Sequence, residues 1–120
     1  MADTQRDLIL SLKGRLKIEP VTISGLQNPI FVKTLNGRER DAFENSCFRG
    51  KGKSRELSTE NIRAKLLVRS ICDEAGSRVF GDHETELLGD LPADVLDVLF
   101  TRAQVLSGLA QEDVDAIASD

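Results

Sequence analysis

The segment NIRAKLLVRSI, residues 61–71, decides the expected fold. Four apolar side chains recur at the i, i+3, i+4, i+7 spacing of one helix face, and two more widen this stripe: Ala64, Leu67, Val68 and Ile71, with Ile62 and Leu66. The stripe predicts a central core helix. We expect this helix to begin at Leu57 and Ser58, with Ser58 as its cap and Leu57 packed on Ile62 as a hydrophobic staple.

Upstream of this helix, the sequence predicts a helix in residues 1–15 and a β-hairpin in residues 16–35. Thr4 is expected to cap the first helix, with Asp7 near the positive end of its dipole. Apolar and polar residues alternate around Pro20, which indicates an edge strand or a bulge because proline cannot donate to a ladder. Residues 24–29 have turn composition, and residues 30–35 are typical of a second strand.

The segment between the hairpin and the core helix has two parts. Asn36 and Glu39 have the spacing of a capping box, which predicts a helix that carries Phe43 and Cys47 one turn apart. Residues 49–55 then contain two glycines and no apolar residue, so we expect an exposed, mobile loop over residues 49–56. Its four bases are the candidate partner-contact residues, namely Arg49, Lys51, Lys53 and Arg55.

Downstream of the core helix, the sequence predicts a turn and a short extended piece that ends at Phe80. Asp82 is then expected to cap a brief helix that closes at Gly89. Pro92 suits the first position of a longer helix that stops at Ser107 and Gly108, and a last short helix is expected over residues 111–118. The sequence therefore predicts one domain over residues 1–120. Its fold class is α+β and mainly α-helical, with one N-terminal β-hairpin packed against four to five helices in residues 36–118.

Charge and composition narrow the classes of function. A net charge of −4 and only 4% aromatic residues argue against a nucleic-acid-binding protein. Residues 1–57 carry 11 Lys and Arg against 7 Asp and Glu, whereas residues 58–120 carry 5 against 13. This division favours attraction between the halves of one chain or between copies, or it reflects a solvated acidic face. No apolar run approaches the ~20 residues of a membrane helix, and the N-terminus does not resemble a signal peptide, so we expect a cytoplasmic protein with no membrane partner.

The sequence offers no constellation for catalysis or metal binding. His83 has no further ligand at a suitable spacing, which predicts a surface residue. Residues 73–84 begin and end like a calcium loop, but Ala75 and Arg78 occupy the third and sixth positions, so a connector is expected. Cys47 and Cys72 stand at apolar positions and are expected to be reduced core thiols. We therefore predict no enzymatic activity, no cofactor and no bound metal.

Four stretches, in this order and spacing, resemble one protein family. They are FVKTLNGRERDAFE at 31–44, NIRAKLLVRSICDEAGSRVF at 61–80, LGDLPADVLDVLF at 88–100 and AQVLSGLAQEDV at 103–114. Together they resemble the tail assembly chaperones of long-tailed bacteriophages and prophages, over about residues 16–118. One departure is Ala110, where proteins of this type often have a Thr or Ser cap.

The resemblance implies a non-enzymatic protein of the bacterial host cytoplasm that is absent from the finished virion. Such chaperones hold the tape-measure protein while tail-tube subunits polymerise around it, and this chain resembles their short, non-frameshifted form. The charge division further leads us to expect a weak, possibly open-ended oligomer of the chain with itself. The alternative is a structural virion protein, such as a head–tail connector or a tail-completion protein. A third hypothesis, a small regulatory nucleic-acid binder, depends only on the basic loop.

Overall fold

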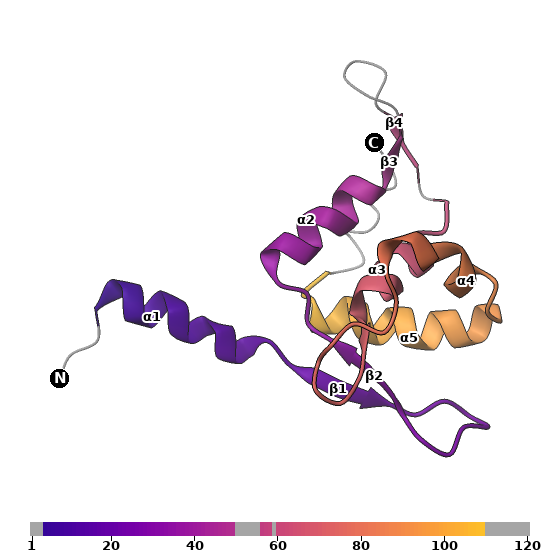
Figure 1. Cartoon of the computed structure of the whole chain (residues 1–120), viewed down its shortest axis with the longest axis horizontal. Coiled ribbons are helices and arrows are strands. Elements are labelled where there is room, and N and C mark those ends of the chain that lie inside the picture. The colour runs from indigo at the N-terminus through magenta and orange to yellow at the C-terminus, as the bar shows by residue number, and fades with distance from the viewer. Residues whose placement is uncertain (1–3, 50–55, 59, 110–120) are drawn as a thin grey trace.

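The computed structural model describes residues 4–49, 56–58 and 60–109. In chain order, the elements are α1 (Gln5–Ser11), the 3-10 helix η1 (Leu12–Arg15), β1 (Ile18–Val21), β2 (Ile30–Lys33), α2 (Gly37–Ser46), β3 (Phe48–Arg49), β4 (Glu56–Leu57), α3 (Ile62–Ser70), β5 (Ile71–Cys72), the 3-10 helix η3 (Asp82–Glu84), α4 (Thr85–Gly89) and α5 (Ala93–Leu106) (Figure 1). The predicted α+β class, mainly α-helical with an N-terminal hairpin packed against helices, is confirmed.

The hairpin belongs to a three-stranded antiparallel sheet of order β1-β2-β5. Val32 lies at its centre, opposite Glu19 on one side and Ile71 on the other. Strand side chains alternate between the two faces of a sheet, so Val21, Val32 and Ile71 share one face, and all three are buried. Helix α5 lies on this face. Its Arg102 donates to both carboxylate oxygens of Glu19, which is on the same face as its partner Val32.

Helix α3 forms the centre of the core, as the sequence predicts. Leu66, Leu67 and Val68 are completely buried, since α2, α4, α5 and β2 all contact this helix. The helix ends at Ser70, however, and the expected continuation through Ile71 is wrong. Ile71 and Cys72 pair with Val32 and Phe31 instead. Ile71 is buried in the strand, as it would be on the core face of a helix, so its apolar character and spacing do not distinguish the two conformations.

The predicted start of the core helix at Leu57 and Ser58 is also wrong. Leu57 lies in β4 and pairs with Phe48 of β3, and the helix begins at Ile62 after Asn61, which has a left-handed backbone with φ of +56°. The backbone N–H of Ser58 donates to the carbonyl of Cys47, so this residue extends the β3–β4 pair rather than capping a helix. Strands β3 and β4 pair in antiparallel orientation. The spacing of helix-cap residues gives no information about such a strand pair.

The other helix ends follow the sequence closely. Two of the four predicted caps form complete capping boxes, Thr4 with Asp7 and Asn36 with Glu39. Pro92 stands one residue earlier than expected, at the N-cap of α5. This helix ends at Leu106 with Ser107 as its C-cap, in agreement with the predicted stop at Ser107 and Gly108. Asp82 does not cap the brief helix, because Gly81 holds that position and the Asp82 carboxylate accepts from Arg78 instead, as described below. The expected helix over 111–118 and the cap position Ala110 lie outside the described residues.

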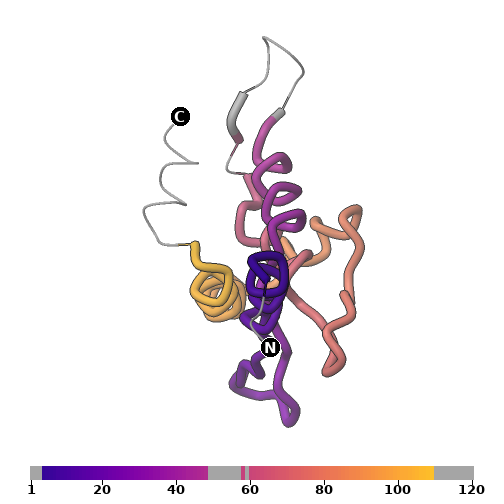
Figure 2. Tube along the Cα trace, turned by 90° about the vertical axis from the view of Figure 1, so that its left-hand side faces the viewer, coloured from indigo at the N-terminus to yellow at the C-terminus, as the bar shows by residue number. Residues whose placement is uncertain are grey.

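Helices α1 and η1 form an arm that projects from the rest of the molecule. We call residues 5–15 the N-terminal arm. No residue of this arm is buried, and Leu8, Ile9 and Leu12 are each about half exposed. Figure 1 shows α1 extending sideways from the start of β1, and Figure 2 shows it nearly end-on in front of the body. The predicted helix therefore forms, but it does not pack on the described core.

Candidate partner-binding groove

An apolar groove of about 590 Å³ opens between the hairpin loop, the connector after β5 and the helices α4 and α5. This volume lies within the roughly 300–1,000 Å³ range of sites that hold small ligands. The apolar residues around it are Ile23, Leu26, Pro29, Ile30, Phe31, Ile71, Val79, Phe80, Leu88, Leu91, Pro92, Val95 and Leu99. We call this feature the apolar groove.

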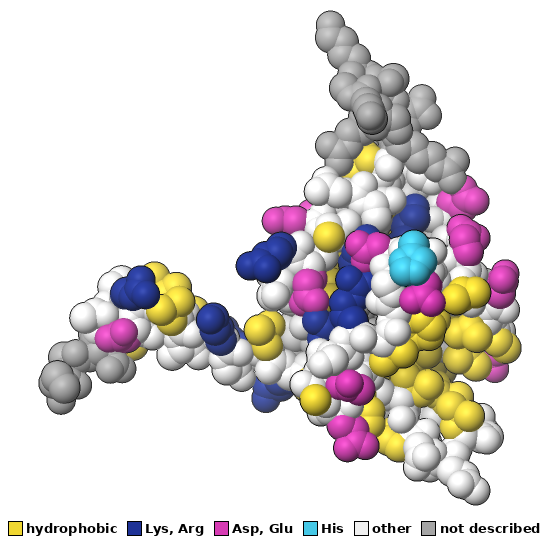
Figure 3. Space-filling model, viewed as in Figure 1, with side chains coloured by type: hydrophobic (Ala, Val, Ile, Leu, Met, Phe, Trp, Pro, Cys, Tyr) yellow, Lys and Arg dark blue, Asp and Glu magenta, His cyan; other side chains and the backbone are white. Residues whose placement is uncertain are grey.

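The groove is accessible because several of its walls are exposed. Leu26 is 52% exposed, Val79 53% and Leu91 38%, although each has a large apolar side chain. Figure 3 shows a broad apolar area on this side of the molecule, with acidic side chains at its border. Exposed apolar areas of this kind typically mark a surface that binds another protein.

The floor of the groove consists of core residues. Leu88 of α4 and Leu99 of α5 are almost completely buried, and Ile71 joins them from β5. The groove therefore continues the hydrophobic core to the surface. An apolar side chain that enters it would contact the core directly and lose its own hydration, which is the source of hydrophobic stabilisation.

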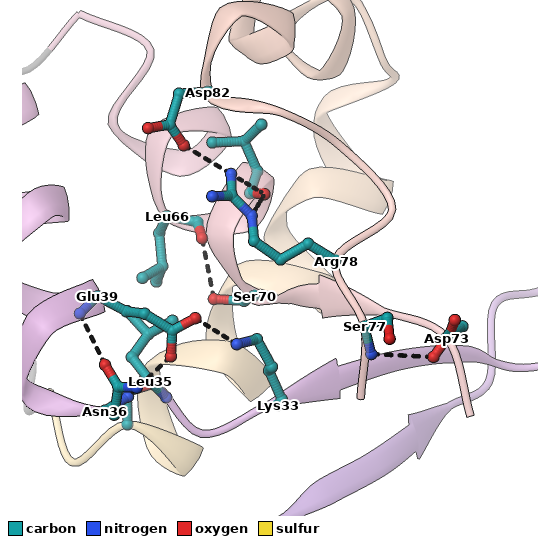
Figure 4. A network of polar contacts seen from close by, with 12 residues as sticks. Lys33, Leu35, Asn36, Glu39, Leu66, Ser70, Asp73, Ser77, Arg78 and Asp82 are labelled. Atoms are coloured by element: carbon teal, nitrogen blue, oxygen red, sulfur yellow. Dashed lines mark hydrogen bonds and ion pairs between the residues drawn. The ribbon is translucent and has the colours of Figure 1, made fainter. Parts of the chain in front are cut away.

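The connector that carries Val79 and Phe80 is fixed at both ends. At its start, the Asp73 carboxylate accepts from the backbone N–H groups of Ala75 and Ser77, an Asx turn drawn in part in Figure 4. Gly76 then turns the chain with φ of +90°. A backbone bridge between Arg78 and Cys72 returns the connector to the sheet. The turn that the sequence predicts in residues 72–80 is present, but the expected extended piece after it is reduced to this bridge at Arg78, and residues 79 and 80 lie in a bend.

A polar cluster holds the far end of the connector. The Arg78 guanidinium donates to the Val68 carbonyl at 3.0 Å and to the Asp82 carboxylate at 2.6 Å, as Figure 4 shows. The hydrogen bond from Arg78 lowers the pKa of Asp82, with further lowering by the charge of Arg69 and opposition from partial burial. Arg69 is itself buried, with its Nη2 3.8 Å from Asp82. Burial lowers the pKa of this guanidinium. The cluster thus fixes residues 78–82, including the two groove residues between them.

Of the four predicted partner-contact residues, the structure describes only Arg49, which is not among the residues that line the groove. The backbone of Arg49 lies in β3 and that of Glu56 in β4, so the ends of the expected loop are paired strands. Lys51, Lys53 and Arg55 lie outside the described residues, and the expected mobility of this loop is therefore not tested.

His83 and the two cysteines have the predicted exposure, although Cys72 lies in β5 and not in the predicted helix. His83 is exposed, and both cysteines are buried free thiols whose pKa is raised, chiefly by burial. Within the described part of the chain, no group of three or more His, Cys, Asp or Glu side chains could hold a metal ion. No helix there is both long and apolar enough to cross a membrane.

Some of the exposed residues of the groove belong to segments whose turn composition gave no indication of a binding surface. Leu26 stands within Ser-Gly-Leu-Gln-Asn-Pro, residues 24–29, and Leu91 stands between Asp90 and Pro92. A large apolar side chain at the tip of a turn is the signal that could have indicated it, since a turn residue is usually polar.

Comparison with known proteins adds no relative: no protein-family model, curated protein or solved structure matches this chain. The groove is therefore interpreted from its own geometry and from the sequence motifs.

Proposed function

We propose that this chain is a tail assembly chaperone that uses the apolar groove to hold an apolar helical segment of a phage tape-measure protein. The observation that carries the proposal is the groove itself, which continues the core to an exposed surface. Support also comes from the four sequence stretches that resemble this family, three of which supply groove residues, such as Phe31, Val79 and Leu91.

The chemistry of the groove suits one face of an amphipathic or apolar helix. A helix presents side chains at i, i+3, i+4 and i+7 to a groove, and apolar anchors at these positions supply most of the binding energy. A tape-measure protein is long, helical and apolar, so unassembled copies expose surface that aggregates. Several copies of this chain, each covering one apolar stretch, would keep that surface out of water.

Acidic residues around the groove suit the same role. The segment from Asp82 to Asp97 supplies the α4 and α5 wall and contains six Asp or Glu and no Lys or Arg. Asp82 and Asp97 pair with arginines of the chain, and the other four form no ion pair with another described residue. An acidic surface around a bound apolar segment keeps the complex charged and limits its association with other complexes. In this proposal the chain acts in the host cytoplasm, catalyses no reaction, releases the tape measure when tail-tube protein arrives and is absent from the finished virion.

The test is co-expression with the cognate tape-measure protein. We expect the wild-type chain to raise the soluble yield of the tape measure and to elute with it, at several copies per partner. Val79→Glu places a charge in the groove and should abolish this effect. Val105→Glu is the matched control, because Val105 is 61% exposed on α5 and does not line the groove.

Two outcomes would contradict the proposal. The chaperone proposal is contradicted if the tape measure stays insoluble when it is co-expressed with the short form and with the extended form of this chain. Detection of the chain in purified virions at fixed copy number favours the structural head–tail connector or tail-completion protein instead.

A further inference from the structure

The N-terminal arm exposes apolar surface that nothing in the described structure covers. Leu8, Ile9 and Leu12 lie within about one third of the helix circumference at helical spacing, and their exposed fractions are 49%, 58% and 51%. Leu10, 46% exposed, lies on the opposite side of the same helix. An amphipathic stripe that packs on nothing is costly in water, and it is typical of a segment that binds elsewhere.

The charges of the arm and the groove are complementary. Residues 5–15 carry Arg6, Lys13 and Arg15 against Asp7. Asp90 and Asp94 flank the groove wall, and neither forms an ion pair with another described residue. Asp94 also lines a small hollow beside Ile23 and Val95 of the groove. A basic, apolar helix thus matches an apolar groove with an acidic edge.

We propose that the N-terminal arm of one copy of this chain docks into the apolar groove of a second copy. Leu8, Ile9 and Leu12 enter the groove, and the bases of the arm face Asp90 and Asp94 of the neighbour. The inference depends only on features of this chain and does not require the proposed function.

The position of the arm favours docking into the groove of a second copy over docking into the groove of the same chain. Lys17, just after the arm, exchanges hydrogen bonds with Thr34, so the chain is fixed at the open end of the hairpin. The groove is walled by the loop at the other end, roughly 13 Å away along the four residues of β1. Figures 1 and 3 show the arm leaving on the side opposite the apolar area. Such a contact is head-to-tail, so it builds open chains rather than closed pairs.

An ion pair within the molecule agrees with this interpretation. Residues 1–57 are net positive and residues 58–120 net negative, yet Glu19 and Arg102 join these halves with the opposite signs. This pair joins one acid of the net positive half to one base of the net negative half, so it leaves the opposite net charges of the two halves in place.

The test uses two variants of the full chain and measures mass by analytical ultracentrifugation over a wide concentration range. Ile9→Glu disables the arm but leaves the groove, and Leu26→Glu disables the groove but leaves the arm. Both positions are more than half exposed, so both variants should fold, which thermal melting verifies. Leu10→Glu, on the other side of the arm, is the matched control.

We expect the wild type and the Leu10→Glu chain to gain mass with concentration beyond a dimer, and each of the other two variants to stay monomeric. An equal mixture of these two should form one-to-one pairs and nothing larger, because one working arm meets one working groove. The proposal is overturned by a wild type that stays monomeric, by variants that assemble like the wild type, or by a mixture that does not pair. The tape measure is not part of this experiment, so its outcome is separate from that of the co-expression test.

Discussion

At the scale of single residues, the carboxylate of Glu39 connects α2 to the sheet. Its Oε1 accepts from the backbone N–H of Asn36, and its Oε2 pairs with Lys33 of β2 (Figure 4). Only 22% of the Glu39 side chain is exposed. Burial raises the pKa of Glu39, but the hydrogen bonds from Asn36 and Lys33 and the charge of Lys33 outweigh it, so the pKa is lowered from its ordinary value of 4.5.

This lowered pKa predicts a dependence of stability on pH. A carboxyl with a lower pKa in the folded chain stabilises the fold above the unfolded pKa, and this contribution is lost as pH falls through the folded value. We expect Glu39→Gln to lower the free energy of unfolding at neutral pH. The difference from the wild type should shrink as pH drops below about 4.5. Denaturant titrations across this pH range measure it, and a difference that does not vary with pH would contradict the assignment.

Gly76 gives a second prediction at the residue scale. Its φ of +90° is strained for any residue with a side chain, and a Cβ there would lie 2.9 Å from Cδ1 of Ile18. Gly76→Ala should therefore destabilise the protein by roughly 1 kcal/mol or more. Gly14→Ala is the control, because a Cβ at that position would meet no heavy atom within 4 Å and its φ is not positive. Equal melting temperatures for the two variants would contradict this assignment.

At the scale of elements, α3 and α1 are both amphipathic helices, yet they contribute differently to the stability of the free chain. Leu67 of α3 is completely buried, whereas Leu12, the residue directly after α1, is 51% exposed. Leu67→Ala should cost about 2–5 kcal/mol, since it removes buried methyl groups and leaves a cavity. Leu12→Ala should change the free energy of unfolding by less than about 0.5 kcal/mol. A large loss for Leu12→Ala in dilute protein would show that the arm packs on its own chain.

The sequence predicted some elements correctly and missed others. Local signals were sufficient for the caps at Thr4 and Asn36, because a capping box involves residues three apart. They were insufficient for β4 and β5. Leu57 and Ile71 are strand residues only because distant partners, Phe48 and Val32, pair with them. The groove was missed for the same reason, since its walls come from four separate segments that only the fold brings together.

At the scale of the whole molecule, the structure separates a compact body from a projecting arm, and the body carries an apolar groove on the side away from that arm (Figures 1 and 3). These two features are the basis of both proposals, self-association through the arm and binding of an apolar partner in the groove. If the proposals hold, the arm of a neighbour and the helix of a partner compete for the groove. Added partner helix should then reduce self-association, which ultracentrifugation of the mixture would measure.

The most direct test of the central claim is to map the bound surface in solution. The chain, labelled with ¹⁵N, is titrated with a peptide from an apolar helical segment of the tape-measure protein, and backbone amide shifts are followed. We predict that the largest shift changes cluster at the hairpin loop around Leu26, the connector around Val79 and the α4–α5 turn around Leu91. Changes confined to the basic run from Arg49 to Arg55, with the groove amides unmoved, would contradict the claim.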